Sequence, residues 1–449
     1  MLHPHDLTPY RSVKPASLIS LDSVHADMEF NDPPKDRTKK IVFDTVLFVS
    51  CLVFGITLAT MSANKAVTKA RPGNMEFANE LYRAVCSKEG NVFISPVSLE
   101  VVMALAYMGA RGNTAQQIKQ SVHLPEDGED VKANFKALMG SLKSTENMTL
   151  EIANKIFTQE KYKILSEYRA VAEESFLSGA QELNFADSEG SRKIINSWVE
   201  EKTRDKIKDL IPPGMLNDLT RLVLVNAIYF KGFWKRQFDA ARTRPGPFHL
   251  NSKEEKTVPM MHLKAKFGYT ESGELDSKIL EMPYQGQDIS MFVILPNDVD
   301  GISKLEEKLA GSNLSEILKH LPVREVEVTM PKFKLEETTD LNEILQKMGM
   351  TDMFSESRAD FSGISGARDL FVSNVLQKAF IEVNEEGSEA AAATAGIIRA
   401  KRAFIEAESY EFIADHPFVF SLHDKHSHRI LFLGRFLVPI EQVVLHEEL

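Results

Sequence analysis

The chain has 449 residues, of which 43% are apolar and 26% charged, with 23 glycines and 19 prolines. This composition excludes a disordered or fibrous protein and supplies material for a large core. The formal charge of −11 argues against nucleic acid as a general partner, because phosphate binding requires an excess of lysine and arginine on one face. Two cysteines, Cys51 and Cys86, cannot build a disulfide framework, and we expect Cys86 to be a small core residue.

The N-terminal residues predict a leader and a targeting segment. Residues 1–40 have the composition of a flexible leader and end in the basic run KDRTKK. Seventeen uncharged residues follow at 45–61, so we expect 41–63 to be a signal peptide or a signal anchor. The small residues Ala59, Ser62 and Ala63 favour cleavage. Only an uncleaved leader would bring the protein to a membrane, and the domain after it should enter the secretory pathway.

Residues 64–445 predict one large α+β domain, because no repeat, linker or composition shift interrupts them. Residues 95–112 predict a helix buried on every face, since Ser95 can cap it, Pro96 can open it and the run is apolar all round. Helical periods also cover 191–207 and 339–349. The expected strands are 221–230, 289–296, 325–330, 375–383, 417–422 and 430–439.

The segment NEEGSEAAAATAG at 384–396 interrupts this pattern. Its alanines alone would predict a helix or a soluble linker. It lies, however, between two expected strands, in a connection of about thirty residues, and loops that long inside a compact domain are usually functional. We place this loop at about 385–412.

Catalytic and metal motifs are weak or missing, so we predict that the chain is not an enzyme and needs no cofactor. There is no nucleophile elbow, phosphate loop, CxxC or HExxH spacing. HDKHSH at 423–428 gathers three histidines, but between two expected strands, where a solvated turn is favoured over a metal site.

Several blocks carry a resemblance to the serpin family. NEEGSEAAAATAG resembles the reactive-loop hinge of inhibitory serpins, and FIADHPFVFSL (412–422) is similar to the family signature. NVFISPVSLEVVMALAYMGARGNT (91–114), LVNAIYFKGFWKRQFD (224–239) and ADFSGIS (359–365) are similar to further family blocks in the same order. The chain departs from the family at Gln377, where many members carry histidine, and we expect a neutral hydrogen-bonding replacement there.

The resemblance implies a fold and a mechanism. The fold would be the serpin fold, with three large mixed β-sheets surrounded by about nine helices and an exposed reactive-centre loop. A target serine protease would attack the loop and form a covalent acyl complex, and the cleaved loop would insert into the main sheet as a strand. The hinge would comprise Glu386, Gly387, Ser388, Glu389, Ala390, Ala391, Ala392, Ala393 and Thr394.

The residue before the cleaved bond selects the protease, and two registers remain open. The commonest serpin spacing places Lys401 there, with Arg402 after the bond, which suits a trypsin-like protease. One residue further on, the bond is Arg402–Ala403, and RAKR (399–402) matches the pattern of furin-like proprotein convertases. Arg399 and Lys401 would then fill acidic subsites. We favour the second register, in which the chain resembles insect-type secretory-pathway serpins that inhibit such convertases.

Alternatives to convertase inhibition are inhibition of secreted trypsin-like proteases, a noninhibitory chaperone serpin resident in the endoplasmic reticulum, and a convertase processing site that is simply cut. The C-terminal HEEL (446–449) resembles receptor-read retrieval signals, so we expect a retrieval receptor as a partner and residence in the endoplasmic reticulum lumen, with escape to the outside as the alternative. Asn147 and Asn313 are candidate glycosylation acceptors. We expect a monomer.

Overall fold

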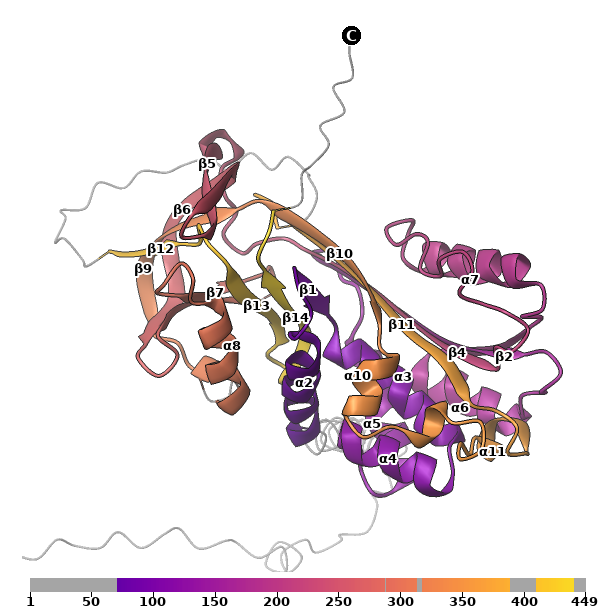
Figure 1. The fold of residues 1–449 in the computed structure, drawn as a ribbon. Helices are drawn as coiled ribbons and strands as arrows, with labels where there is room; N and C mark the ends of the chain where they lie inside the picture. Colours follow the sequence, from indigo (N-terminus) through magenta and orange to yellow (C-terminus); the bar gives the residue numbers. More distant parts are fainter. Residues whose placement is uncertain (1–70, 287, 313–316, 388–408, 440–449) are drawn as a thin grey trace, which may run out of the picture. The chain divides into compact units, whose positions relative to one another are not determined.

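The computed structural model describes residues 71–286, 288–312, 317–387 and 409–439 (Figure 1). The chain divides into two units, Met1–Ser62 and Ala63–Leu449, and every described residue belongs to the second. The predicted leader, the segment 41–63 and the HEEL tail lie outside the described residues, so their roles stay predictions.

Helices account for much of the described chain. Nine α-helices lie in it: α2 (Arg71–Val85), α3 (Pro96–Gly109), α4 (Gly112–Val122), α5 (Gly128–Ser141), α6 (Ser166–Phe176), α7 (Ser188–Lys202), α8 (Ile302–Gly311), α10 (Asn342–Lys347) and α11 (Ser362–Ser365). Two short 3-10 helices accompany them, η2 (Ala240–Arg242) and η3 (Asp352–Phe354). Across the described ranges, no helix combines the length and apolar content needed to cross a bilayer.

The described strands form two sheets. They are β1 (Val92–Ile94), β2 (Met148–Gln159), β3 (Gly179–Leu183), β4 (Leu222–Gly232), β5 (Arg244–Asn251), β6 (Glu254–Ser272), β7 (Ser277–Pro283), β8 (Ile289–Pro296), β9 (Val323–Pro331), β10 (Phe333–Asp340), β11 (Val372–Val383), β12 (Tyr410–Ile413), β13 (Phe418–Asp424) and β14 (Arg429–Phe436). One sheet has nine strands in the order β1-β14-β13-β8-β7-β6-β9-β12, with β5 paired to β6. The other has five, in the order β10-β11-β4-β2-β3.

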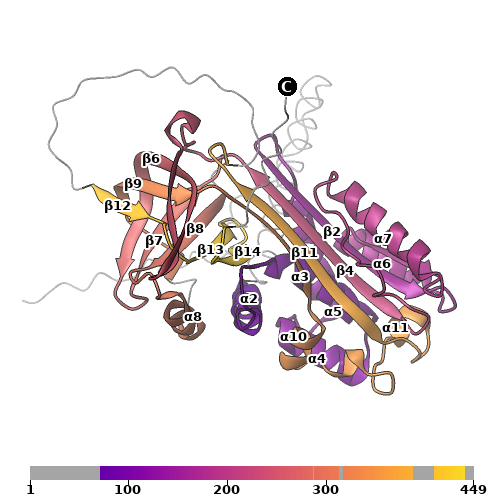
Figure 2. The ribbon, with the colours of Figure 1, turned by 45° about the horizontal axis from the view of Figure 1, so that its top comes forward.

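The three sheets implied by the resemblance are therefore two in the described chain. The reason is the 19-residue strand β6, which pairs with β5, β7 and β9 and joins their strands into one hydrogen-bonded path. The two neighbours that matter most for function lie in the five-stranded sheet. There β4 and β11 run parallel, side by side, as Figure 2 shows.

Helix α3 confirms the predicted fully buried helix. The Ser95 hydroxyl accepts a hydrogen bond from the Ser98 N–H at 3.3 Å, which caps the helix, and Pro96 occupies its first turn. The helix lies between the two sheets and contacts β14 of one and β2 and β4 of the other. Its continuous apolar surface is explained by protein on every side.

Strand β4, which was predicted at 221–230, is buried on both faces. One set of alternating residues, including Leu224 and Ile228, packs into the core around α3. The other set, including Val223 and Val225, packs into a second core with residues of α7 such as Ile195. The five-stranded sheet is therefore covered on its two faces by different helices.

Two predicted helices have different ends in the structure. Helix α7 was expected at 191–207 but begins at Ser188, because the Asp187 carboxylate caps it, and it stops at Lys202 before two residues with positive φ, Arg204 and Asp205. Helix α10 was expected at 339–349 but begins at Asn342, because β10 continues through Asp340 in pairing with β11.

Candidate functional site

The segment that joins β11 to the predicted loop is a tight turn over residues 384–387. The Asn384 side-chain oxygen accepts hydrogen bonds from the N–H groups of Glu386 and Gly387, both at 3.1 Å. The Asn384 carbonyl accepts a further bond from the Gly387 N–H at 3.3 Å. An asparagine side chain that binds its own backbone two residues on is typical of turns, so β11 stops where the predicted hinge begins.

The chain that leaves β4 holds this turn from the side. The backbone N–H of Trp234 donates to the Glu386 carbonyl at 2.8 Å, and its indole N–H donates to the Asn384 carbonyl at 2.9 Å. The Phe238 N–H donates to the Glu385 carbonyl at 2.8 Å. Three carbonyls of the turn are therefore bound to the exit of β4.

Gly387 lies against the backbone at the end of β4. Its φ is +119°, a conformation that side chains with a Cβ rarely adopt. A Cβ on it would stand 2.2 Å from the Gly232 carbonyl oxygen and 2.6 Å from the Trp234 nitrogen. Both obstacles are backbone atoms, so the position admits glycine alone.

Glu385 ties the turn to two further elements through its side chain. Its carboxylate accepts a hydrogen bond from the Thr243 hydroxyl at 2.8 Å and pairs with the Lys332 ammonium at 3.1 Å. Burial opposes ionisation of Glu385, but the backbone, Thr243 and Lys332 outweigh it and lower the pKa of the carboxyl. The carboxylate is therefore ionised at neutral pH.

A buried row of amide side chains crosses the middle of the five-stranded sheet. Gln377 of β11 is the register partner of Asn226 of β4, which in turn is the partner of Asn154 of β2. Gln377 donates to the Asn226 side chain at 2.6 Å and exchanges two bonds with the Ser95 backbone, at 2.8 and 3.0 Å. Asn226 donates to Asn154. The glutamine that replaces the family's histidine is thus a neutral hydrogen-bonding group, and it joins the two parallel strands.

Most residues of the predicted loop lie outside the described residues. This holds for the hinge residues Ser388 to Thr394, for Arg399, Lys401, Arg402 and Ala403, and for Asn313. Of the predicted hinge and reactive-bond residues, the structure describes only Glu386 and Gly387. It places them against the chain that follows β4. Asn147 is exposed before β2, so its glycosylation stays a prediction.

The histidine-rich segment 423–428 forms the turn between β13 and β14, as expected. The Asp424 carboxylate accepts bonds from the His426 N–H at 2.9 Å and the Ser427 hydroxyl at 2.6 Å. His423 is hydrogen-bonded to Ser421, and burial lowers its pKa to about 3. Among the described residues, no group of histidine, cysteine and carboxylate side chains could hold a metal ion.

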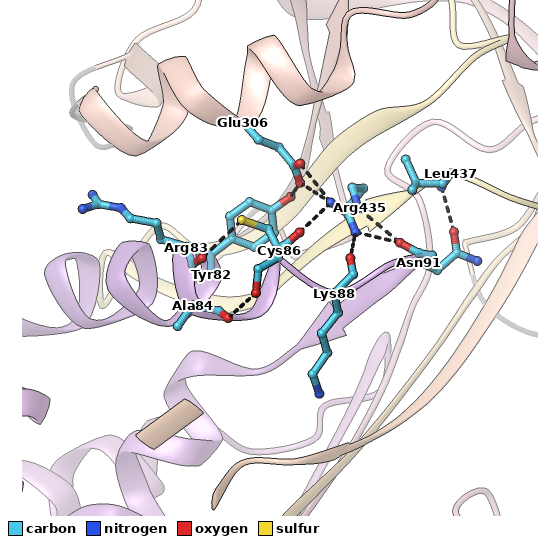
Figure 3. Close-up of polar contacts among 11 residues, drawn as sticks. Tyr82, Arg83, Ala84, Cys86, Lys88, Asn91, Glu306, Arg435 and Leu437 are labelled. Carbon is cyan, nitrogen blue, oxygen red and sulfur yellow. Dashed lines mark hydrogen bonds and ion pairs between the residues drawn. The ribbon is translucent and has the colours of Figure 1, made fainter. Parts of the chain in front are cut away.

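The chain that follows the loop is anchored deep in the nine-stranded sheet. Arg435 of β14 donates to the carbonyls of Cys86, Lys88 and Gly90, at 3.0, 2.6 and 2.9 Å, where α2 ends (Figure 3). The same guanidinium pairs with Glu306 of α8 at 2.9 Å, with both side chains largely buried. Cys86 is free and partly buried, and burial raises the pKa of its thiol, as expected for a packed residue.

With this fold and hinge described, the comparisons identify the class of protein. The family model "Serpin (serine protease inhibitor)" matches residues 72–439. Human leukocyte elastase inhibitor is 43% identical over 376 residues, which cover 82% of this chain and 98% of that protein. Human serpin B3 is 40% identical over 386 residues, with the same coverage.

Solved structures agree with the sequence comparisons. The crystal structure of Serpin48, described as a highly specific serpin of the insect Tenebrio molitor, has a TM-score of 0.75 and 36% identity, and the match covers 85% of this chain and 99% of that one. Uncleaved ovalbumin has a TM-score of 0.73 and 30% identity, with coverages of 82% and 99%. The chain belongs to the serpin family.

The comparisons also correct two statements. The relatives named above include an elastase inhibitor, and none of their names mentions a furin-like convertase, so they support the family and not the predicted closeness to convertase-inhibiting insect serpins. The prediction that the chain is not an enzyme rested only on weak or missing catalytic motifs in the sequence. It is replaced by a positive assignment to a family of serine protease inhibitors.

Sequence reasoning missed the partners of the turn at 384–387, among them Trp234 and Lys332. Trp234 lies in the block 224–239 that resembles the family, but nothing in the local pattern pairs it with Asn384, which follows 150 residues later. Lys332 stands between two strands, β9 and β10, where a lysine has no special signal. Both are found only through the fold.

Proposed function

We propose that this serpin inhibits furin-like, subtilisin-related proprotein convertases, with Arg402 before the attacked bond and Ala403 after it. The sequence RAKR at 399–402 carries the proposal and outweighs the spacing, since Arg402 is fifteen residues beyond the anchored Gly387, one more than the commonest serpin spacing. The elastase specificity pocket is a small one, whereas a lysine or arginine before the bond requires an acidic pocket. The target would therefore differ from that named for the elastase-inhibiting relatives.

The proposed reaction begins as ordinary proteolysis. The hydroxyl oxygen of the protease serine attacks the Arg402 carbonyl carbon, and an ester bond forms there. The bond between Arg402 and the Ala403 nitrogen breaks, and the serine proton ends on the new amino terminus of Ala403. The protease is then joined to the loop through Arg402, and hydrolysis of the ester by water would release it.

Insertion of the loop would prevent that release. The loop would enter as a new strand between β4 and β11, antiparallel to both, starting at Gly387, which lies where these strands end. Alternate residues of a strand face one side, so Ser388, Ala390, Ala392 and Thr394 would face the interior. Small side chains suit a site where β4 and β11 must separate quickly to admit the loop.

A matched pair of variants tests the cleaved bond. Arg402→Ala should abolish the SDS-stable complex with furin, because no cation would precede the bond. Lys401→Ala should retain it at a reduced rate. Mass spectrometry of the complex should identify Ala403 as the new amino terminus in the unaltered protein. The opposite pattern, with Lys401→Ala inactive and Arg402→Ala active, would assign the bond to Lys401–Arg402.

A third variant tests the convertase assignment itself. Arg399→Ala should slow complex formation with furin at least tenfold, since one subsite cation is lost, and should leave the rate with trypsin unchanged. Unchanged rates with both proteases would reject the convertase assignment. A trypsin complex without a furin complex would support the second candidate, inhibition of secreted trypsin-like proteases through Lys401.

The proposed cellular site is the secretory pathway, with retrieval to the endoplasmic reticulum. The uncharged run 45–61 and the HEEL tail support this proposal together. Expression of the full chain with and without its last four residues tests it. Retention should be lost on deletion, and equal secretion of both forms would contradict a retrieval signal.

A further inference from the structure

The chain that leaves β4 carries an unusual charge for this acidic protein. Residues 231–244 contain five cations and a single carboxylate, Asp239, in a chain whose formal charge is −11. Of these cations, Lys235, Arg236, Arg242 and Arg244 are exposed. We call these four residues the basic platform.

The platform is held rigidly by the same contacts that fix the hinge. The residues on either side of Lys235 and Arg236 are anchored, because Trp234 and Phe238 are buried and donate their N–H groups to the turn at 384–387. The Trp234 ring also stacks on Tyr284 at 4.3 Å. Asp239 caps η2 through a 2.9 Å bond from the Ala241 N–H, which fixes the chain before Arg242. The cations therefore have a fixed backbone beside the first residue of the loop.

Carboxylates neutralise little of the charge of the three arginines of the platform. Glu385 and Glu386 are the acidic residues of the adjoining turn, and the Glu385 carboxylate is bound to Lys332 and Thr243. Asp239 lies 3.8 Å from Arg242, with both side chains mostly exposed. In the described parts of the chain, no carboxylate lies within ion-pair distance of Arg236 or Arg244. The Arg244 guanidinium donates to its neighbour's carbonyl, that of Thr243, at 2.9 Å.

We infer that the basic platform is a docking surface for an acidic face of the protease that cleaves the loop. This inference rests on the proposed function. A protease bound to the loop must approach the end of the molecule from which the loop departs, and the platform lies at that end. Opposite charges there would raise the association rate and favour proteases with an acidic rim.

A sulfated polysaccharide is the competing partner, and the structure favours the protease. The four cations of the platform lie in one short stretch of chain that also contains Asp239. A polyanionic chain is bound best by a long row of cations. Trp234 and Phe238, which flank Lys235 and Arg236 of the platform, are hydrogen-bonded to the turn at 384–387. A partner bound to the platform would therefore lie beside the start of the reactive loop.

The test is the double variant Arg236→Glu/Arg244→Glu, which reverses the two cations that form no ion pair with the described residues. The association rate constant for the covalent complex with furin should fall about tenfold at low salt, and the difference should shrink at 1 M salt, where charges are screened. The number of inhibitor molecules consumed per protease should not change, because the loop and its insertion are intact.

The control is Lys136→Glu/Lys347→Glu, which makes the same charge change with exposed lysines of α5 and α10. Helix α10 lies at the start of β11, where Asn342 donates to the Ser373 carbonyl, about 40 Å along the strand from the hinge. This control should retain the unaltered rate.

The outcomes separate this inference from the proposed function. Equal association rates for the unaltered protein and Arg236→Glu/Arg244→Glu would overturn the docking surface alone. No furin complex with the unaltered protein would overturn the proposed function and the docking surface together. If the double variant loses only its retention on immobilised heparin and keeps its furin rate, the platform binds polysaccharide and the protease inference is wrong.

Discussion

At the scale of single residues, Gly387 is the position most sensitive to substitution. Gly387→Ala should lower the urea midpoint of unfolding and cost about 2–3 kcal/mol, because the new Cβ combines strained φ with backbone clashes at 2.2 and 2.6 Å. Gly90→Ala is the control, since Gly90 has φ +83° with open space around it and should lose only about 1 kcal/mol. Equal losses would show that the turn moves away from β4 at no cost.

Glu385 predicts a pH dependence of stability at the same turn. Its pKa is lower in the folded state than the ordinary value of about 4.3, so its stabilisation is fully present above that pH and is lost as the pH falls through the folded pKa. Glu385→Gln should therefore be less stable than the unaltered protein at pH 7, and the two should converge as the pH falls below the folded pKa of Glu385. Glu343→Gln, an exposed carboxyl on α10, is the control.

Gly387 also shows how much of the candidate site could be predicted from the sequence. The sequence predicted that Gly387 begins a hinge, because it precedes a run of small residues. It could not predict that Gly232 and Trp234 fill the space where a Cβ would stand. That contact joins segments about 150 residues apart, and only the parallel pairing of β4 with β11 brings them together.

At the scale of elements, the row Gln377–Asn226–Asn154 joins β11, β4 and β2 where a new strand would enter. The bond between Gln377 and Asn226 must break before the strands can separate. Gln377→Leu should leave the Ser95 backbone groups and the Asn226 oxygen without partners, at a cost of about 2–4 kcal/mol. Loop insertion on mild heating should become faster. An unchanged insertion rate would mean that the row does not limit separation of the strands.

Gln377→His should add a pH response at the row Gln377–Asn226–Asn154, which holds only neutral amides in the unaltered protein. A buried imidazole resists protonation, so the unfolded state would bind more protons below the ordinary histidine pKa of about 6.5. Burial of His423 already makes the unaltered protein less stable below that pH, so the stability lost by Gln377→His relative to the unaltered protein should grow as the pH falls from 8 to 5. Parallel profiles over this range would contradict the assigned burial.

Element types were more predictable than element ends. Strand β4 was predicted from its β-rich run, and helix α3 was predicted because it is apolar on all sides over its length, which only burial explains. The ends of α7 and α10 were missed because tertiary pairing decided them: β10 extends into the expected start of α10 to pair with β11. The merging of two expected sheets through β6 was also unpredictable, since one long strand and two short ones have the same local pattern.

At the scale of the whole molecule, the chain beyond the loop should stay bound after cleavage. Strands β13 and β14 are internal to the nine-stranded sheet, and Arg435 is bonded to α8 and to the end of α2. Limited trypsin treatment should give two bands on a denaturing gel but an unchanged mass by native mass spectrometry. Release of the C-terminal fragment without denaturant would contradict this arrangement.

Trapping itself should depend on which side of the inserted strand a residue faces. Ala392→Arg places a long cation on the interior side, where insertion would bury it without a partner, whereas Ala393→Arg places the same side chain on the outer side. The first variant should be cleaved by trypsin without an SDS-stable complex and without a gain in melting temperature. The second should form the complex, and its cleaved form should melt at a higher temperature than the intact protein. Equal trapping by both variants would reject the proposed alternation, and cleavage without trapping in the unaltered protein would reject inhibition by insertion.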